Sequence, residues 1–233
     1  IYGRGSNADS KHPDITPSHI VDLKRISRYH ISSDAIIANN SQKAFRRNKD
    51  GLFNPPYVIV KECPDNNGVI AGIYNGPSSI ITSTSTFVFK TSSYLDQVIL
   101  TTYLNSKLVN CILFLTSSTW GIERERLLLD DEVALLPSPF DLLNKESSKT
   151  LTNLYNKIFE NNSQILIEDT HDIQESIDDI FYRIFNLSER DIELIEDTFI
   201  YAVELFAYQA KSSALSRTTI DDLTAYASRL CKC

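Results

Sequence analysis

The sequence predicts an α+β protein: a small mixed β-sheet unit with one long helix, followed by a helical C-terminal unit. Three observations predict this class. Short β-branched runs separated by turn residues crowd the first 90 residues. A long apolar run then follows a helix-capping pair. From about residue 146 onward, apolar residues recur with a period of 3.6 residues, which is typical of amphipathic helices.

The clearest sheet element is a β-hairpin. Tyr57–Glu62 and Val69–Tyr74 are short β-branched runs, and the intervening PDNNG supplies turn residues and a glycine that tolerates positive φ. Ile80–Lys90 alternates and is rich in Thr, Ile, Val and Phe, which predicts a third strand. Pro55–Pro56 open the first run, as expected of an edge strand that needs no ladder donor.

The predicted long helix runs from Tyr94 to Leu115 and begins with Ser93 and Asp96 as a capping pair. Because of its polar residues we expect a buried helix and not a membrane span. Trp120–Gly121 then predicts a turn, with Trp120 in the core or at a domain junction, and Ile122–Leu129 is expected to be extended. Pro137 and Pro139 suggest a boundary within residues 137–148, between an α+β domain, 1–145, and a helical domain, 146–233.

Each helix of the second half carries one apolar stripe, which we expect to face inward. Ser188 with Asp191 and Thr219 with Asp222 predict two helix starts. The stripes are Leu151, Leu154, Ile158 and Phe159; Ile173, Ile177, Ile180, Phe181, Ile184 and Phe185; Ile192, Ile195, Phe199, Ala202 and Phe206; and Ile220, Leu223, Ala227 and Leu230.

Composition is ordinary for a soluble globular protein, with 42% apolar and 23% charged residues among 233. Residues 1–50 hold nine basic against five acidic side chains, whereas residues 146–233 hold eight against sixteen, so a local basic face coexists with a net charge of −7.

The start at Ile1 and the lack of methionine suggest a piece of a longer protein. Four cysteines without disulfide or zinc spacing predict free thiols and a cytoplasmic location: Cys63, Cys111, Cys231 and Cys233.

Asn54, Pro55, Pro56 and Tyr57 spell the NPPY motif of enzymes that methylate adenine N6 in DNA. In such enzymes the motif follows a buried strand, and the aromatic ring stacks on a base extruded from the duplex. Here the residues before Asn54 are polar, the apolar strand comes after the motif, and no Gly-rich cofactor turn precedes it. We therefore predict that these four residues are not catalytic; they would carry the chemistry if that prediction were wrong.

Other catalytic patterns are weaker. Gly72-Ile73-Tyr74 matches a GIY-type nuclease motif without its companion residues, and the acidic residues near Asp14 and Asp22 are too closely spaced for a metal-dependent nuclease. The four histidines are scattered, no catalytic triad or phosphate loop is present, and we predict no metal site.

The stretch from Leu52 to Phe140 resembles the C-terminal target-recognition region of N6-adenine DNA methyltransferases and fused restriction–modification enzymes, and also specificity subunits. The segments that carry the resemblance are FNPPYVIVK, AGIYNG, STSTFVF, Leu104-Asn105-Ser106, Trp120-Gly121 and the LPSP before Phe140. The resemblance covers roughly residues 36–140 and lacks the catalytic half of the family. It implies a non-catalytic module that binds double-stranded DNA for a methyltransferase catalytic domain in the same or a partner chain. S-adenosylmethionine would then be a cofactor of the parent protein and not of this chain.

On that reading, basic side chains hold phosphates and loop side chains read base edges. The candidates for phosphate contact are Lys43, Arg46, Arg47, Lys49, Arg25, Arg28, Lys61, Arg124 and Arg126. For Arg124 and Arg126, internal salt bridges are the favoured use. Asn39, Asn40 and Gln42 are candidates for reading adenine. Two alternatives remain: a catalytic methyltransferase or nuclease fragment that uses NPPY, and a protein-interaction module that docks through the acidic helical half.

Overall fold

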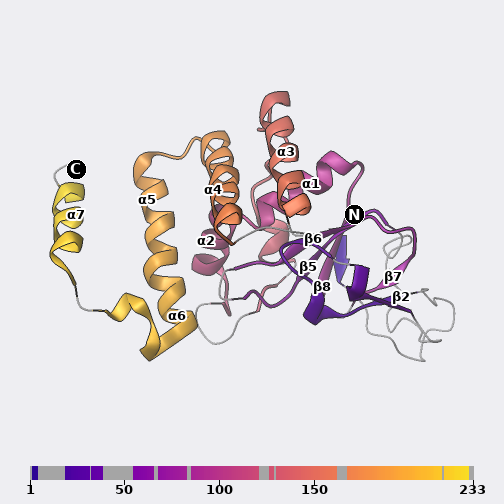
Figure 1. The fold of residues 1–233 in the computed structure, drawn as a ribbon, viewed down its shortest axis with the longest axis horizontal. Helices are drawn as coiled ribbons and strands as arrows, with labels where there is room; N and C mark the ends of the chain where they lie inside the picture. The colour runs from indigo at the N-terminus through magenta and orange to yellow at the C-terminus, as the bar shows by residue number, and fades with distance from the viewer. Residues whose placement is uncertain are drawn as a thin grey trace.

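The computed structural model describes residues 2–4, 19–31, 33–38, 55–65, 68–82, 85–120, 126–128, 130–161, 167–216 and 218–230. A five-stranded sheet of order β1-β8-β5-β6-β3 forms the centre, and a three-stranded sheet of order β4-β2-β7 lies against it. Figure 1 shows helices α1 to α4 on one side of the main sheet and β2 and β7 on the other. The predicted α+β class is confirmed.

The strands of the two sheets are β1 (Tyr2–Arg4), β2 (His19–Val21), β3 (Tyr29–His30), β4 (Ile36–Ala38), β5 (Tyr57–Lys61), β6 (Ala71–Tyr74), β7 (Ile80–Ile81) and β8 (Thr86–Lys90). The α-helices are α1 (Tyr94–Leu104), α2 (Lys107–Thr116), α3 (Lys145–Asn161), α4 (Ile167–Ile184), α5 (Glu189–Asp197), α6 (Glu204–Tyr208) and α7 (Ile220–Leu230). A π-helical segment, η4 (Thr198–Val203), joins α5 to α6.

The predicted hairpin is confirmed. Strands β5 and β6 are antiparallel, with Tyr57 opposite Tyr74, and the turn is closed by two backbone hydrogen bonds between Asp65 and Gly68. Gly68 has φ +107°, a conformation that glycine adopts without steric cost. The expectation of an edge strand is wrong, because β5 lies between β8 and β6. Pro56 precedes the first ladder residue, so its missing N–H removes no sheet hydrogen bond.

Both faces of the main sheet are buried, because its apolar residues alternate between two cores. Val58 and Val60 of β5 face the helices, whereas Tyr57 and Ile59 face the smaller sheet. The predicted third strand is wrong as a single element. Its first part, β7, pairs in parallel with β2, and its second part, β8, pairs with β5, so the two parts belong to different sheets.

The predicted long helix is also wrong as a continuous element. It breaks into α1 and α2, which are bent by 56°. At the break, the Asn105 side chain donates to the Ala71 carbonyl (2.8 Å) and accepts from the Ala71 N–H (3.1 Å), so it pairs with β6 as a neighbouring strand would. Ser106 then accepts from the Val109 N–H and caps α2. These tertiary contacts stabilise the bend between the two helices.

Within the described ranges, no single helix is long and apolar enough to cross a bilayer. The bent pair α1 and α2 reaches that length and apolarity only when both helices are taken together.

The helical half packs on the sheet through one continuous core. Leu151 and Tyr155 of α3 and Ile177 and Phe181 of α4 belong to the same buried cluster as Val58 of the sheet. The capping pair at Ser93 and the capping box at Ser188 are confirmed. The proposed boundary between residues 145 and 146 stays a prediction.

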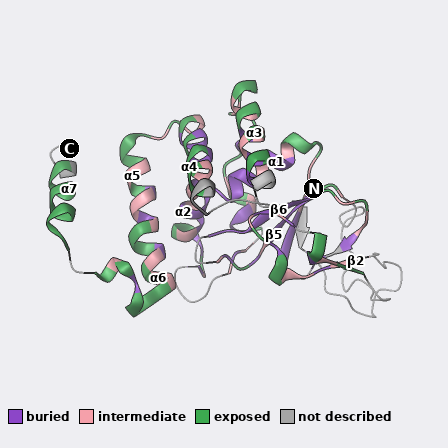
Figure 2. Ribbon diagram, in the orientation of Figure 1, coloured by how far each residue is buried: buried purple, intermediate pink, exposed green. Residues whose placement is uncertain are grey.

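Two predicted apolar stripes differ from the structure. Ala202 is exposed and Val203 is buried instead, because the wider π-helical turn of η4 shifts the inward face by one residue. Ile220 and Leu223 of α7 were expected inward but are 81% and 57% exposed. Figure 2 shows α7 exposed and set apart from the other helices. The side chain of Leu230 lies outside the described residues.

Candidate nucleic-acid interface

A groove of about 940 Å³ lies where the turn end of the hairpin meets the helical half. Arg28 and Lys61, both predicted as phosphate contacts, line it together with Lys107 at the start of α2. Asp65, His171 and Glu204 also line it, so the groove presents charges of both signs. The three basic residues come from the β3 entry, the end of β5 and the N-terminus of α2, which only the fold brings together.

Arg28 is fixed by its neighbours. Its guanidinium donates to Asp65 at 3.1 Å, and the Arg28 side chain is 23% exposed. The next residue, Tyr29, has φ +68°, a strained conformation for a side chain of this size that costs about 1 to 3 kcal/mol. The Tyr29 hydroxyl donates to Gln174, and the Tyr155 hydroxyl donates to the Tyr29 carbonyl at 2.9 Å. Helices α3 and α4 therefore hold the backbone that presents Arg28 to the groove.

Lys107 contacts two acidic side chains, the buried Asp178 and the partly buried Glu196. Its ammonium lies 2.7 Å from Glu196, and its backbone N–H donates to Asp178 at 2.8 Å. Gln174 donates to the second oxygen of Asp178 at 3.1 Å, and Tyr182 donates to Glu196. Burial raises the pKa of Asp178 to about 7, although the hydrogen bonds from Lys107 and Gln174 act in the opposite direction. This cluster joins α4 and α5 to the start of α2.

Lys61 differs from the other two basic residues. It is partly buried, and among the described parts of the chain it forms no ion pair. A lysine held at the wall of a groove with its ammonium uncommitted can approach an anionic oxygen without first breaking a salt bridge. Lys61 is therefore the basic side chain of the groove best placed to contact a phosphate.

The remaining predicted basic residues fall into two groups. Arg25 bridges Asp34 at 3.0 Å and Asp22 at 3.5 Å on the exposed side of the smaller sheet. Arg126 bridges Glu62 at 3.0 Å, which confirms the internal salt bridge predicted for it. The other predicted DNA-contact residues, basic and polar, lie outside the described ranges: Lys43, Arg46, Arg47, Lys49, Arg124, Asn39, Asn40 and Gln42.

The NPPY segment leads into a buried strand. The prediction that the strand begins after the prolines is confirmed, because β5 starts at Tyr57. Tyr57 is fully buried, and its ring centre lies 5.5 Å from that of Tyr74 within the core between the two sheets. Burial also raises the pKa of the Tyr57 hydroxyl. Stacking on an extruded adenine would require this ring to leave the core; Asn54 lies outside the described residues.

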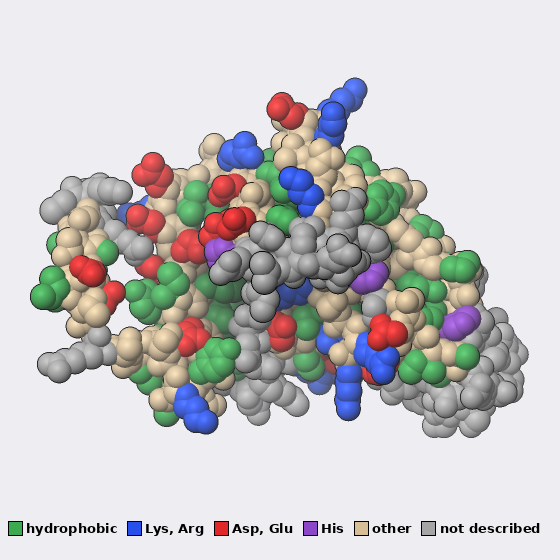
Figure 3. Space-filling model, viewed as in Figure 1, with side chains coloured by type: hydrophobic (Ala, Val, Ile, Leu, Met, Phe, Trp, Pro, Cys, Tyr) green, Lys and Arg blue, Asp and Glu red, His purple; other side chains and the backbone are tan. Residues whose placement is uncertain are grey.

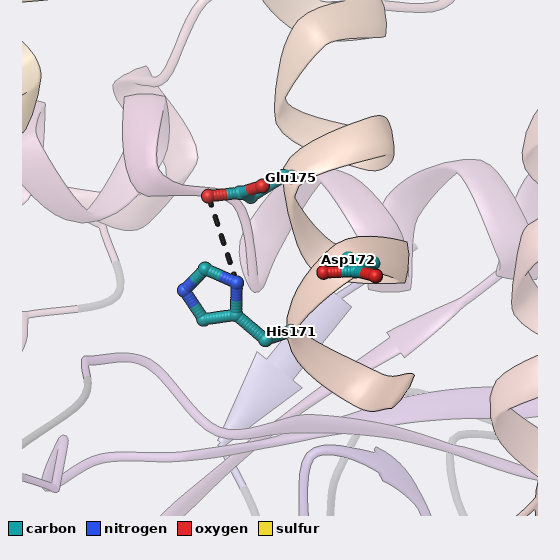
Figure 4. Close-up of side chains that lie close together, drawn as sticks. All are labelled: His171, Asp172 and Glu175. Atoms are coloured by element: carbon teal, nitrogen blue, oxygen red, sulfur yellow. Dashed lines mark ion pairs between the residues drawn. The ribbon is translucent and has the colours of Figure 1, made fainter. Parts of the chain in front are cut away.

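One cluster of metal-ligating side chains was missed by the sequence analysis. His171, Asp172 and Glu175 of α4 place one ligand atom each within 4.8 Å of one another, and all three are exposed. Figure 4 shows His171 and Glu175 pointing toward each other, with a distance of 3.5 Å between Nδ1 and Oε1. The i, i+1, i+4 spacing on a helix could have revealed the cluster. The same spacing is also that of an ordinary surface ion pair, which needs no metal.

Charge is unevenly spread over the surface. Acidic side chains gather over α4 and α5 in Figure 3. They belong to the acidic half of the sequence, and they repel an anionic partner from the outer surface of these helices.

No protein-family model matches the chain, and no curated protein matches it. A solved structure of the Type IIL restriction-modification enzyme MmeI in complex with DNA is similar over 63% of this chain and 21% of that chain, with 13% identity and a TM-score of 0.47. The matched region is thus about a fifth of that enzyme, and a likeness this distant decides neither fold nor function.

Proposed function

We propose that this chain is a non-catalytic, cytoplasmic DNA sequence-recognition module of an N6-adenine DNA methyltransferase or related restriction–modification enzyme. It binds duplex DNA and positions a catalytic domain that belongs to the same or a partner chain. The observation that carries the proposal is the meeting of Arg28 and Lys61 in one groove. The sequence resemblance over residues 36–140 and the burial of Tyr57 support it as well.

In this proposal the groove residues fix the position of the DNA backbone, and base edges are read elsewhere. Lys61 contacts a phosphate directly, while Arg28 shares its guanidinium between Asp65 and the DNA. Contacts to phosphates are independent of sequence, so they supply affinity and orientation. The basic residues Arg46 and Arg47, with Asn39, Asn40 and Gln42 nearby in sequence, are proposed to add the contacts that distinguish one site from another.

The direct test is a fluorescence-anisotropy titration of labelled duplex DNA at two salt concentrations. Binding that weakens as salt rises is expected, and Lys61→Ala should lower affinity and reduce the slope of log K against log salt by about 1. Lys149→Ala is the matched control, because Lys149 is an exposed lysine of α3 that lines a different hollow. Absence of binding to any duplex at low salt, or affinity indifferent to the double change Arg46→Ala and Arg47→Ala, would refute the proposal.

The enzymatic alternative has its own measurement. If NPPY were catalytic in this chain, S-adenosylmethionine would bind to it. We expect no heat of binding in isothermal titration calorimetry with S-adenosylmethionine. Saturable binding that Tyr57→Phe or Asn54→Ala weakens would favour the enzyme over the recognition module.

A specific observation favours a second function, docking through the helical half. The apolar stripe of α7 is uncovered: Ile220 is 81%, Leu223 57% and Tyr226 62% exposed. We propose that α7 attaches the module to the methyltransferase catalytic domain. Replacing Leu223 and Tyr226 by serine should leave DNA binding unchanged but abolish co-elution with the catalytic chain on gel filtration. Loss of DNA binding in the same variant would contradict separate roles for the two surfaces.

A further inference from the structure

A second cavity, of about 620 Å³, is lined by His30 of β3, the neighbour of the groove residue Tyr29. Its wall combines the end of β6 with the loop 75–78, the start of α1 and the buried face of α3. Residues of the smaller sheet, among them His19 and Ile36, complete it. Its volume is within the range of small-molecule sites, which span roughly 300–1,000 Å³.

Three tyrosine rings line this cavity, and each of the three hydroxyls donates a hydrogen bond to another group of the protein. Tyr74 donates to the Ser78 carbonyl at 3.1 Å, Tyr94 to Asn156 at 3.0 Å, and Tyr155 to the Tyr29 carbonyl at 2.9 Å. Tyr94 and Tyr155 lie edge to face, with ring centres 6.4 Å apart and planes at 78°. The rings are therefore fixed in orientation, and what they offer the cavity is apolar surface.

The loop 75–78 is built closely against one of these rings. A Cβ added to Gly76 would lie 2.4 Å from the Tyr74 hydroxyl oxygen, so the glycine allows the loop to pass directly over the ring. Asn75 of this loop and Ser33 are both exposed and line the cavity, where they contribute an amide and a hydroxyl group. Amide and hydroxyl groups are donors and acceptors without charge.

Charge is missing from the described residues that line the cavity, none of which is Lys, Arg, Asp or Glu. Burial lowers the pKa of His30, against the raising influence of Asp34. The groove around Lys61 has the opposite character, since it carries charges of both signs. Among the described lining residues, a phosphate, a carboxylate or an ammonium group would therefore meet no lysine, arginine, aspartate or glutamate.

We propose that the cavity is a binding site for one planar, uncharged aromatic heterocycle of the size of a nucleobase. Aromatic rings provide stacking or edge contacts to such a heterocycle, and the amide of Asn75 and the hydroxyl of Ser33 pair with its polar edge. The inference goes beyond duplex recognition and does not depend on it. The ligand is either a free nucleoside or a base extruded from DNA, because both present the same ring.

The test uses the full chain with adenosine, guanosine, cytidine and thymidine, each alone, in ligand-observed NMR. Binding of at least one nucleoside is expected, and Tyr94→Ala should weaken it about tenfold, the usual effect of removing a stacking ring. Tyr94→Phe keeps the ring and should keep the affinity. Tyr201→Ala is the matched control, since it removes a tyrosine of η4 that is 53% exposed. Circular dichroism confirms that each variant is folded.

Two results would refute the proposed site: no nucleoside bound at millimolar concentration, or Tyr94→Ala and Tyr201→Ala variants that bind the nucleoside equally well. Competition separates the two sources of the ligand. A duplex with one mismatched base that displaces the nucleoside, when a fully paired duplex does not, identifies an extruded base. Failure of both duplexes to displace it identifies a free nucleoside as the ligand.

Discussion

The main sheet and the last helix use apolar residues in opposite ways. In the sheet, both faces are buried, and Tyr57, Val58, Ile59 and Val60 of β5 are all fully inaccessible. In α7, an equally regular apolar stripe lies exposed to solvent. The comparison teaches that an amphipathic pattern requires a covering surface without specifying where that surface comes from. Both faces of the main sheet are covered by other parts of the same chain.

The comparison can be tested most strongly by removing one tyrosine from each region. Tyr57→Ala deletes a fully buried ring and should lower the free energy of unfolding by about 4 kcal/mol, because it leaves a cavity between the two sheets. Tyr226→Ala in α7 should change it by less than about 0.5 kcal/mol. Urea denaturation followed by circular dichroism measures both. Equal effects would mean that α7 is covered in solution.

A second test concerns the joint between α1 and α2. Asn105→Ala leaves the N–H and the carbonyl of Ala71 without partners in a buried position, so the unfolding free energy should fall by about 3 kcal/mol. Asn153→Ala, an exposed change on α3, is the control and should have almost no effect. The midpoint of urea unfolding gives the comparison. An Asn105→Ala protein as stable as the control would show that the bend does not depend on the two hydrogen bonds between Asn105 and Ala71.

A third test uses pH at the junction between the helical half and α2. Asp178 has a folded pKa of about 7, raised by burial, whereas an unfolded aspartate titrates near 4. Between these values the folded state holds a proton that the unfolded state has lost. Stability should therefore fall as pH rises from about 4 to 7, by up to about 1.4 kcal/mol per pH unit, and level off above 7.

The measurement for Asp178 is urea unfolding at a series of pH values. Asp178→Asn removes the ionisation and should flatten this part of the profile, whereas Asp179→Asn, on the exposed side of α4, should leave the slope unchanged. A profile of Asp178→Asn that keeps the original slope would assign the pH dependence to another group.

The smallest expected effects concern the two helix caps. Ser188→Ala removes the capping box of α5, which packs on the core, and should lower the unfolding free energy by about 1 kcal/mol. Thr219→Ala removes the equivalent contacts with Asp222 at the start of α7. Because α7 is exposed, this change should increase amide hydrogen exchange locally without moving the global unfolding midpoint. A shift of the midpoint by both changes would show that α7 unfolds together with the core.

The candidate groove was predictable only in part. Arg28 and Lys61 were identified as basic residues, but nothing local indicates that they share a surface with Lys107, since the three are far apart in sequence. The salt bridge of Arg126 was predicted, while its partner Glu62 was not. The strained backbone at Tyr29 has no local sequence signal either, because it is held by Gln174 and Tyr155 from the helical half.

The amino-acid sequence by itself determined the hairpin with its glycine turn, the caps at Ser93, Ser188 and Thr219, and the period of the helical stripes. These features depend on residues only a few positions apart, whose local chemistry is the same in any fold. The tertiary structure alone decided that β7 and β8 join different sheets, that the long helix bends at Asn105, and that the charged groove and the second cavity are each lined by a residue of β3. Those outcomes depend on partners distant along the chain, which meet only when the two buried faces of the sheet are covered.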